Sequence, residues 1–350
     1  GTFDRFFHVL VRIHSDDGGY GLGEVEAYPS FERLGVETPE GIVAVIRDYL
    51  VPCMIGQDPF RIGQIWKSMD RAVTGYWRVK AGLDIALHDL QGRHLGLPVH
   101  ALLGGKVRDS YVVEGVGYGI SIGEPSEVAA IAERAAADGY RQLELKAGDP
   151  DPSMDVERLS RVRAAIGPDI PIKMDFNGYY DPKTAVQLIR RLEPLGLQWV
   201  EQPAKHWDLD GLAFVRRSVG VKTVIDETVE TPEEMMRAAR AEAADCVHVK
   251  PTIKGGFTLC RQIVAIARAA GIEVVPGSSA PTGVGHAAAQ AFISVTPEIS
   301  GGTHGSPLDM LADDIVTQPV PPNSTTVTIS ELPGLGIELD ERKVEKYRVR

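Results

Sequence analysis

The sequence predicts an α/β barrel that follows a smaller α+β domain, and three observations support this fold class. After residue 110, eight short apolar segments alternate with helical segments, which is typical of parallel strands linked by helices. The remaining length suits a barrel, which takes about 250 residues. An open doubly wound sheet usually carries a glycine-rich phosphate loop, and the sequence has neither a GxGxxG motif nor a P-loop. The candidate strands lie in YVVEGVGYG, RQLELK, IPIKMD, LQWVEQP, KTVIDE, DCVHVKP, IEVVP and EISGG.

The first part of the chain is predicted to form a β-hairpin followed by helices. Residues 5–27 hold two apolar runs around DDGGYG, whose glycines supply the positive φ that such a turn needs. Apolar residues on one face and the stop signals Gly96 and Pro98 predict a helix over 77–96, and two further helices are expected near 38–50 and 59–70. We therefore predict three units: an α+β domain over 1–107, a barrel over 108–318, and a C-terminal segment over 319–350 that returns to the first domain.

Composition and charge limit the classes of function. An apolar content of 43% with 24% charged residues is ordinary for a globular protein, and no apolar run is long enough for a membrane span. The net charge of −11 argues against a nucleic-acid partner, which needs a basic face. It allows an anionic small substrate if a metal supplies positive charge locally. Three cysteines without CxxC spacing indicate reduced thiols, and with no recognisable signal peptide they predict a cytoplasmic protein.

Five ionisable residues end consecutive predicted strands. They are Lys146, Asp175, Glu201, Asp226 and Lys250, at intervals of 29, 26, 25 and 24 residues, each close to one strand–helix unit. In a barrel the strand ends face one mouth, where active sites lie. Three crowded carboxylates require a cation, and oxygen ligands favour Mg²⁺ over zinc, which prefers His or Cys. The sequence therefore predicts Mg²⁺ at the three carboxylates, with a lysine on each side.

A lysine that acts as a base must have a lowered pKa. The reference value is about 10.4, so a shift of roughly three units is needed, and burial and the facing lysine are the expected causes. Glu144, two residues before Lys146, lies on the same side of its strand and would raise that pKa instead. We hypothesise that Glu144 pairs with Lys173 on the next strand. His248, two residues before Lys250, is expected to be a hydrogen-bonded core group.

These motifs together resemble those of the enolase superfamily, and within it the muconate-lactonizing-enzyme subgroup (mandelate racemase/muconate lactonizing enzyme-like). The resemblance covers essentially the whole chain and rests on AGLDIALHDLQGRHLGLPVHALLGG, MDFN, VEQP, IDET and VKPTIKGG. It implies a modified (β/α)7β barrel with an N-terminal capping domain, rather than a complete (β/α)8 barrel. It also implies one Mg²⁺ per chain on Asp175, Glu201 and Asp226, with Lys146 and Lys250 as acid and base on opposite faces of a small carboxylate substrate.

The chemistry implied by the resemblance is removal of a proton α to a carboxylate, through an enediolate. Racemisation or epimerisation and cycloisomerisation are both available and would make the protein an isomerase. Loss of a β-hydroxyl from the same intermediate would make it a dehydratase, hence a lyase. Two alternatives use other chemistry: a Schiff-base aldolase with a lysine nucleophile, which leaves the carboxylates without a role, and a catalytically idle barrel that binds metal.

Three departures from the family pattern bear on this expectation. Glu144 occupies the place of the first lysine in the family's K-x-K motif. The seventh strand segment, VVPGSSAPTG, has no histidine base, which supports the lysine pair. The eighth, EISGGTHG, lacks the D-x-D of dipeptide epimerases, which disfavours an aminoacyl-dipeptide substrate. The resemblance further implies that the chain begins at the second strand of the capping domain, so that the first strand and part of the specificity loop are missing.

Other residues are expected around the substrate. Asn177, two residues beyond Asp175, would reach the metal region, and Glu227 would support it from beside a metal ligand. Tyr28, Ser278 and Glu144 complete the candidate substrate-binding or supporting residues. Aromatic side chains expected near the rim of the mouth are Phe31, Tyr179, Tyr180 and Trp207. A homo-oligomer without a membrane or nucleic-acid partner is expected.

Overall fold

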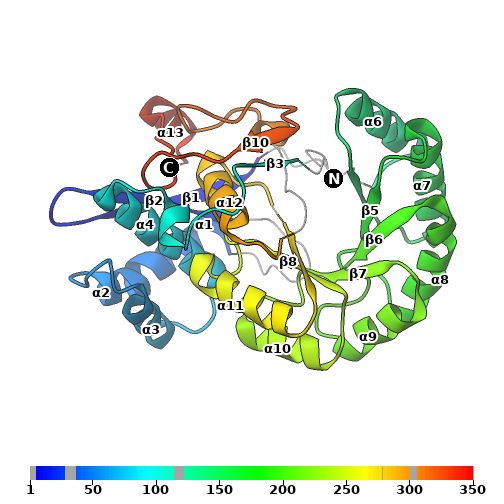
Figure 1. Cartoon of the computed structure of the whole chain (residues 1–350), viewed down its shortest axis with the longest axis horizontal. Helices are drawn as coiled ribbons and strands as arrows, with labels where there is room; N and C mark the ends of the chain where they lie inside the picture. The colour runs from blue at the N-terminus through cyan, green and yellow to red at the C-terminus, as the bar shows by residue number, and fades with distance from the viewer. Residues whose placement is uncertain (1–4, 28–36, 114–121, 278, 300–305, 350) are drawn as a thin grey trace.

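The computed structural model describes residues 5–27, 37–113, 122–277, 279–299 and 306–349. Its largest sheet has six parallel strands in the order β4-β5-β6-β7-β8-β9, and a helix follows each strand on the outside (Figure 1). The strands are β4 (Leu143–Lys146), β5 (Ile172–Asp175), β6 (Leu197–Glu201), β7 (Lys222–Ile225), β8 (Cys246–Val249) and β9 (Glu273–Pro276). The helices are α6 (Pro125–Ala137), which precedes β4, then α7 (Pro152–Ile166), α8 (Pro182–Leu192), α9 (Leu209–Ser218), α10 (Pro232–Arg240), α11 (Gly256–Ala269) and α12 (Gly283–Val295).

Local sequence signals explain where the outer helices begin. Helices α7, α8 and α10 each place proline in the first turn, behind Asp151, Asp181 or Thr231 as the N-cap. Each N-cap side chain accepts a hydrogen bond from a backbone N–H of the first turn. Proline has no N–H to lose at that position, and the cap satisfies a donor that the helix leaves open. The carboxyl ends of β4, β5 and β7 are therefore followed by well-defined loops.

The N-terminal region begins with the predicted hairpin. Strands β1 (Phe7–His14) and β2 (Tyr20–Ala27) pair antiparallel. They are followed by α1 (Pro39–Val45), a π-helical turn over Ile46–Leu50, α2 (Val51–Met54), α3 (Ile62–Ala72), α4 (Trp77–Leu95) and α5 (Val99–Leu102). The backbones of β2 and α4 approach closely, because a Cβ atom on Gly23 would lie 2.0 Å from the carbonyl oxygen of Gly82. The hairpin and the helices near 38–50, 59–70 and 77–96 are thus where the sequence predicted them.

Helix α4 is buried on all sides, whereas the sequence predicted one apolar face. It packs on β2 on one side and on barrel helix α11 on the other. Two carboxylates of α4, those of Asp84 and Asp89, accept hydrogen bonds from the neighbouring elements. Asp84 accepts hydrogen bonds from Trp66 Nε1 (2.6 Å) and from the hydroxyl of Thr258 (2.5 Å), and Asp89 accepts from the backbone N–H of Leu22 (2.7 Å). Burial of these charges is tolerated because each has hydrogen-bond donors.

Two glutamates of β2 also reach the barrel. Glu24 is fully buried and accepts hydrogen bonds from the backbone N–H groups of Thr282 (2.9 Å) and Gly285 (3.2 Å). Glu26, which is 1% exposed, accepts one from the N–H of Ala280 (3.1 Å). The segment after β9 is therefore held by carboxylates from the hairpin. The N-terminal region and the barrel therefore contact each other through polar groups as well as through apolar ones.

The first and eighth predicted strands differ from the expectation. Residues Ser110–Val112 form β3, which pairs antiparallel with β10 (Thr326–Thr328) instead of joining the barrel sheet. In the eighth segment, Ile299 makes one parallel bridge to Val274 of β9. The rest of the first segment from residue 114 and of the eighth from residue 300 lies outside the described residues. The parallel sheet that the structure describes thus contains six of the eight predicted strands.

The C-terminal segment contacts the N-terminal region. The Arg93 guanidinium of α4 donates to Glu338 Oε1 (2.5 Å) and to the carbonyl of Ile337 (2.6 Å), and the backbone N–H of Leu335 donates to Asp89 (2.6 Å). Helix α13 (Glu341–Tyr347) also lies in this segment. One 3₁₀ turn, Pro307–Asp309, comes shortly before the segment, and another, Glu193–Leu195, precedes β6. The exact boundaries at 107 and 318 stay a prediction.

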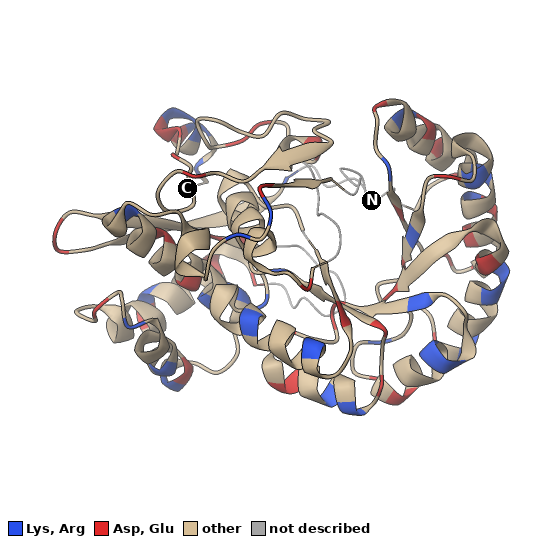
Figure 2. Ribbon diagram, in the orientation of Figure 1, with Lys and Arg blue, Asp and Glu red and all other residues tan. Residues whose placement is uncertain are grey.

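Charged side chains of both signs lie along the outer barrel helices (Figure 2). Such mixing is typical of helices that face water. Among the described residues, no helix combines the length and the apolar character that crossing a membrane requires.

Candidate active site

The five predicted residues all lie at the carboxyl ends of the parallel strands. Lys146, Asp175 and Glu201 are the last residues of β4, β5 and β6, and Asp226 and Lys250 directly follow β7 and β8. The sheet register places Lys146 beside Asp175, and Asp175 beside Glu201. Strands with parallel registers bring these ends to one mouth. The structure therefore arranges them as lysine, three carboxylates and lysine across five adjacent strands.

Each lysine contacts a carboxylate. Lys146 Nζ lies 2.5 Å from Asp175 Oδ2 and 2.9 Å from Glu144 Oε1. Lys250 Nζ donates to Asp226 Oδ2. The other oxygen of Asp226, Oδ1, lies 2.9 Å from Nζ of a third lysine, Lys254. Asp226 is thus bound by two cations, one on each carboxylate oxygen.

Lys254 is a site residue that the sequence analysis missed. It is 1% exposed, and its Nζ also donates to the backbone carbonyls of Asp226 (2.9 Å) and His248 (2.7 Å). The sequence feature that could have identified Lys254 is its place in VKPTIKGG, four residues after Lys250. Because it lies in the turn after β8, no strand periodicity marked it as inward-facing.

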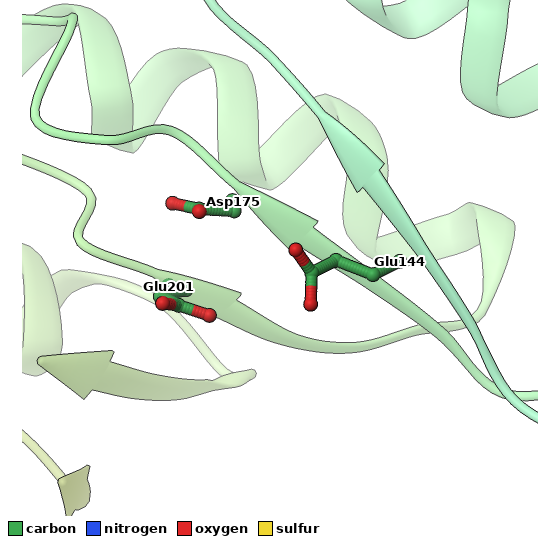
Figure 3. A group of neighbouring side chains, drawn as sticks. All are labelled: Glu144, Asp175 and Glu201. Carbon is green, nitrogen blue, oxygen red and sulfur yellow. The ribbon is translucent and has the colours of Figure 1, made fainter. Parts of the chain in front are cut away.

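Three carboxylates form a compact group (Figure 3). One oxygen from each of Glu144, Asp175 and Glu201 lies within 4.8 Å of the others, and the side chains come from β4, β5 and β6. Glu144 is 15% exposed in its side chain, Asp175 2% and Glu201 6%, so water screens them little. Asp226 is not a member of this group, and its two oxygens contact Lys250 and Lys254.

The electrostatics of the carboxylates follow from this arrangement. Burial, assisted by the charge of Glu201, raises the pKa of Asp175 to about 7. Burial, with the charges of Glu144 and Asp226, raises the pKa of Glu201 to about 8. The pKa of Asp226 is instead held well below its ordinary value, because Lys250 and Lys254 outweigh its burial. Burial and repulsion between carboxylates therefore outweigh the nearby lysines at Asp175 and Glu201, whereas the lysines outweigh burial at Asp226.

The lysines differ from the sequence expectation. Burial alone would lower the pKa of Lys146, but Asp175, Glu144 and Glu201 raise it well above its ordinary value. The pKa of Lys250 is raised in the same way, since Asp226 and Glu201 outweigh its burial. A lysine base requires a lowered pKa, and these contacts with carboxylates act in the opposite direction. The attraction of adjacent carboxylates exceeds the cost of burying the ammonium groups.

The predicted supporting residues are near the carboxylates. Asn177 Nδ2 donates to Glu227 Oε1 (2.8 Å), and the Asn177 backbone N–H donates to Asp175 Oδ1 (2.8 Å). Glu227 is buried, and burial together with the Asp226 charge raises its pKa to about 7. Its second oxygen, Oε2, has no hydrogen-bond partner within the described part of the chain. This pair connects the loop after β5 with the loop after β7.

Beneath the site, Lys173 Nζ lies 3.8 Å from the centre of the Trp199 ring, and Lys173 is in register with Glu144. The proposed pairing of Lys173 with Glu144 stays a hypothesis. His248 is 6% exposed, and its Nε2 lies 3.0 Å from Glu201 Oε2 without hydrogen-bond alignment. Burial and Lys250 lower the pKa of His248 to about 3, so it is neutral. The expected hydrogen bond of this core histidine is not formed with any described residue.

Of the aromatic residues expected near the rim, one that the structure describes is placed elsewhere. Tyr28 and Ser278, and Phe31 at the rim, lie outside the described residues. Tyr179 and Trp207 are exposed, in the loops that follow β5 and β6. Tyr180 is not a rim residue: it is buried, and its hydroxyl donates to Asp155 Oδ2 (2.5 Å).

Gly277 is a further position that the sequence did not single out. A Cβ atom there would lie 2.3 Å from Lys250 Cε. The glycine therefore leaves room for the lysine side chain.

The fold and the acidic group between two lysines define an α/β-barrel enzyme, and comparisons with known proteins identify the family. Residues 1–104 match the mandelate racemase/muconate lactonizing enzyme N-terminal domain, and residues 127–343 match the enolase C-terminal domain-like family. The chain belongs to the mandelate racemase/muconate lactonizing enzyme family of the enolase superfamily. The predicted family and the modified barrel with its cap are confirmed.

Three relatives illustrate the similarity. Muconate cycloisomerase 1 of Rhodococcus opacus is 32% identical over 342 residues, which is 97% of this chain and 90% of the relative. The crystal structure of N-succinyl Arg/Lys racemase from Bacillus cereus ATCC 14579 has a TM-score of 0.91 at 29% identity, covering 98% of this chain and 90% of that one. The dipeptide epimerase from Enterococcus faecalis V583, crystallised with Mg and the dipeptide L-Leu-L-Tyr, has a TM-score of 0.87 at 29% identity, covering 95% and 91%. All three are isomerases, which agrees with the predicted enzyme class.

Proposed function

We propose that this enzyme removes a proton α to the carboxylate of a small substrate, with Lys146 and Lys250 acting on opposite faces. The observation that carries the proposal is the arrangement of two buried or half-buried lysines at β4 and β8, with the carboxylates of β5 to β7 between them. The relatives that are named racemase, epimerase and cycloisomerase support an isomerase outcome. A dehydratase that uses the same proton removal is the alternative, because the enediolate serves both outcomes.

The residues fit one Mg²⁺ per chain. The donors are carboxylate oxygens, as this ion prefers, and burial raises the pKa values of Asp175 and Glu201, so a bound cation would stabilise their charged forms. Asp175, Glu201 and Asp226 would hold the ion. When bound, it would supply positive charge where negative charge develops on the substrate carboxylate. The Mg present in the dipeptide epimerase relative supports this choice of metal.

The two lysines divide the proton transfer. The lysine that removes the proton must be neutral, and the lysine that delivers one must be charged. The raised pKa of each lysine suits the donor, and the ion pairs with Asp175 and Asp226 oppose loss of a proton from the acceptor. Asn177 and Glu227 hold the loops around the carboxylates in position through their hydrogen bond.

The substrate is proposed only as a class, a small carboxylate with an acidic α-hydrogen. Tyr179 and Trp207 are exposed beside the mouth and offer apolar surface to the body of such a substrate. The sequence EISGGTHG, without D-x-D, favours a substrate other than an aminoacyl dipeptide. The expected homo-oligomer and cytoplasmic location belong to the same proposal.

The proposal is tested by isotope exchange. The protein is incubated with Mg²⁺ in D₂O with pooled amino acids, N-acyl and cyclic amino acids and hydroxy acids, and products are analysed by mass spectrometry. We expect deuterium to enter one compound, and to be lost with EDTA, Lys146→Ala or Lys250→Ala. Loss of water from the compound would identify the dehydratase. Exchange that persists in both lysine variants would contradict the proposed bases.

A further inference from the structure

A pocket lies at the amino ends of the barrel strands, opposite the end that carries the lysines and carboxylates. Gln142 directly precedes β4, Gln198 is the second residue of β6, and both line the pocket together with residues 110–113 around β3. Its volume is about 530 Å³, which is within the range of sites that hold small molecules. The four-residue separation of Gln142 and Lys146 corresponds to about 13 Å along a strand. A molecule in this pocket would therefore lie apart from the candidate active site.

Two arginines that line this pocket have no carboxylate partner among the described residues. Arg108 Nη2 donates to two backbone carbonyls in the segment after α12, both at 3.2 Å, and forms no ion pair there. Arg141 has neither an ion pair nor a hydrogen bond within the same part of the chain. The acidic neighbour Asp109 pairs with Lys106 instead (2.7 Å). Although the chain has a net charge of −11, no aspartate or glutamate is among the described residues that line the pocket.

Tyr111 provides an independent sign that a ligand binds here. It lines the pocket and is 5% exposed, and its hydroxyl has no hydrogen-bond partner in the part of the chain that the structure describes. Burial raises the pKa of this hydroxyl, so that it keeps its proton and can donate. A buried polar group without a partner is rare in folded proteins and requires an explanation. An acceptor bound in the pocket would provide it.

The chemistry of these donors favours an anion. A guanidinium presents paired N–H groups that match the oxygens of a carboxylate or a phosphate, and hydrogen bonds to charged acceptors are stronger than those between neutral groups. The two glutamines contribute neutral groups, since Gln142 Nε2 donates to Gln198 Oε1 and thereby sets the orientation of both amides. An oxyanion could accept from Arg108, Arg141 and Tyr111 at once, whereas a cation would be repelled by both arginines.

We propose that this pocket binds a small anion whose carboxylate or phosphate oxygens contact Arg108, Arg141 and the Tyr111 hydroxyl. Such an anion would connect β3 with the amino ends of β4 and β6. In the described sheets β3 pairs with β10 and not with these strands. The anion would stabilise the folded barrel, because the unfolded chain does not present the pocket. The inference does not depend on the proposed function, since none of these residues belongs to the mouth.

Isothermal titration calorimetry tests the pocket with three anions: inorganic phosphate, glycerol 3-phosphate and succinate. Glycerol is the neutral control, and sodium chloride keeps the ionic strength constant. We expect the full chain to bind at least one of the anions but not glycerol, with the same affinity in the presence and absence of Mg²⁺. Binding of phosphate alone supports an inorganic oxyanion as the ligand, and binding of either other probe supports an organic one. Absence of binding by all three anions at millimolar concentration would overturn the inference, as would binding that requires Mg²⁺.

Substitutions locate the bound anion. Arg141→Gln should weaken binding about 10- to 100-fold, because it removes a charged donor. Arg161→Gln is the matched control: it changes the net charge equally, but Arg161 pairs with Glu157 on α7 (2.8 Å), and both side chains are exposed. Equal affinities of these two variants would contradict the proposed contact. Loss of binding in Lys250→Ala, with Arg141→Gln unchanged, would place the anion at the mouth and refute the inference without affecting the proposed function.

Tyr111→Phe distinguishes a binding role from a structural one. It should weaken anion binding about 3- to 10-fold, as expected for the loss of a neutral donor. The urea midpoint of the anion-free protein should not fall, because the hydroxyl has no hydrogen-bond partner among the described residues. A lower midpoint with unchanged anion affinity would show that the hydroxyl is structural, and it would refute its assignment to the anion.

Discussion

Replacing Lys254 by methionine should destabilise the protein more than any comparable change of a surface lysine. Its Nζ lies 2.9 Å from Asp226 Oδ1 and donates to two backbone carbonyls at 2.9 and 2.7 Å, while the side chain is almost fully buried. Methionine has a similar length and volume, so packing changes little. The variant leaves one carboxylate oxygen and two carbonyls without this donor.

The expected loss is about 3–5 kcal/mol in the free energy of unfolding, the range for removing one partner of a buried ion pair. The carbonyl groups add to it, although contributions at one site do not sum. Lys222→Met is the matched control, because Lys222 pairs with Glu273 at the surface with both side chains about half exposed. Its loss should not exceed about 1 kcal/mol.

Urea unfolding followed by circular dichroism measures both variants, with the change taken from the midpoint and slope of the same transition. A loss below about 1 kcal/mol in Lys254→Met, no larger than in Lys222→Met, would refute the reasoning. It would mean that the three acceptors find water or other donors when the ammonium group is removed.

Three further outcomes are expected. Gly23→Ala should cost at least 1–3 kcal/mol in urea unfolding, because its Cβ would lie 2.0 Å from the Gly82 carbonyl oxygen; wild-type stability would contradict this contact. Tyr180→Phe should lower the free energy of unfolding by about 1–2 kcal/mol, because it removes the hydrogen bond to Asp155, while deuterium exchange continues. Loss of exchange in a folded variant would instead indicate that Tyr180 contacts the substrate. The raised pKa of Lys146 leaves little neutral base at pH 7, so kcat/KM should rise with pH through pH 9, and a falling profile over that range would count against Lys146 as the base.

The fold and the positions of the site residues were predictable because both follow from periodicity. Alternation along a strand places Glu144 and Lys146 on one side, and the strand–helix repeat places Asp175 and Glu201 one unit apart. These relations are local, and the structure reproduces the strands that carry them.

Other features depend on contacts between distant segments. Helix α4 is buried on both sides because the hairpin and α11 enclose it, so Asp84 and Asp89 became internal anchors instead of surface charges. The pKa of Lys146 was expected to fall, and it rises because two carboxylates lie within 3 Å of its Nζ. The sequence analysis did not identify Lys254, because it lies in a turn. Strand periodicity, which predicts the side to which a side chain points, does not extend into the turn.

The contact of β2 with the segment after β9 affects how this protein can be recombined with its relatives. Glu24 and Glu26 bind the backbone of residues 280–285 inside the molecule. The natural seam for a chimera, near residue 104, would separate these carboxylates from their donors. The donors are backbone N–H groups, so a hybrid that takes its first 104 residues from a relative keeps these contacts if that relative carries carboxylates at the positions of Glu24 and Glu26.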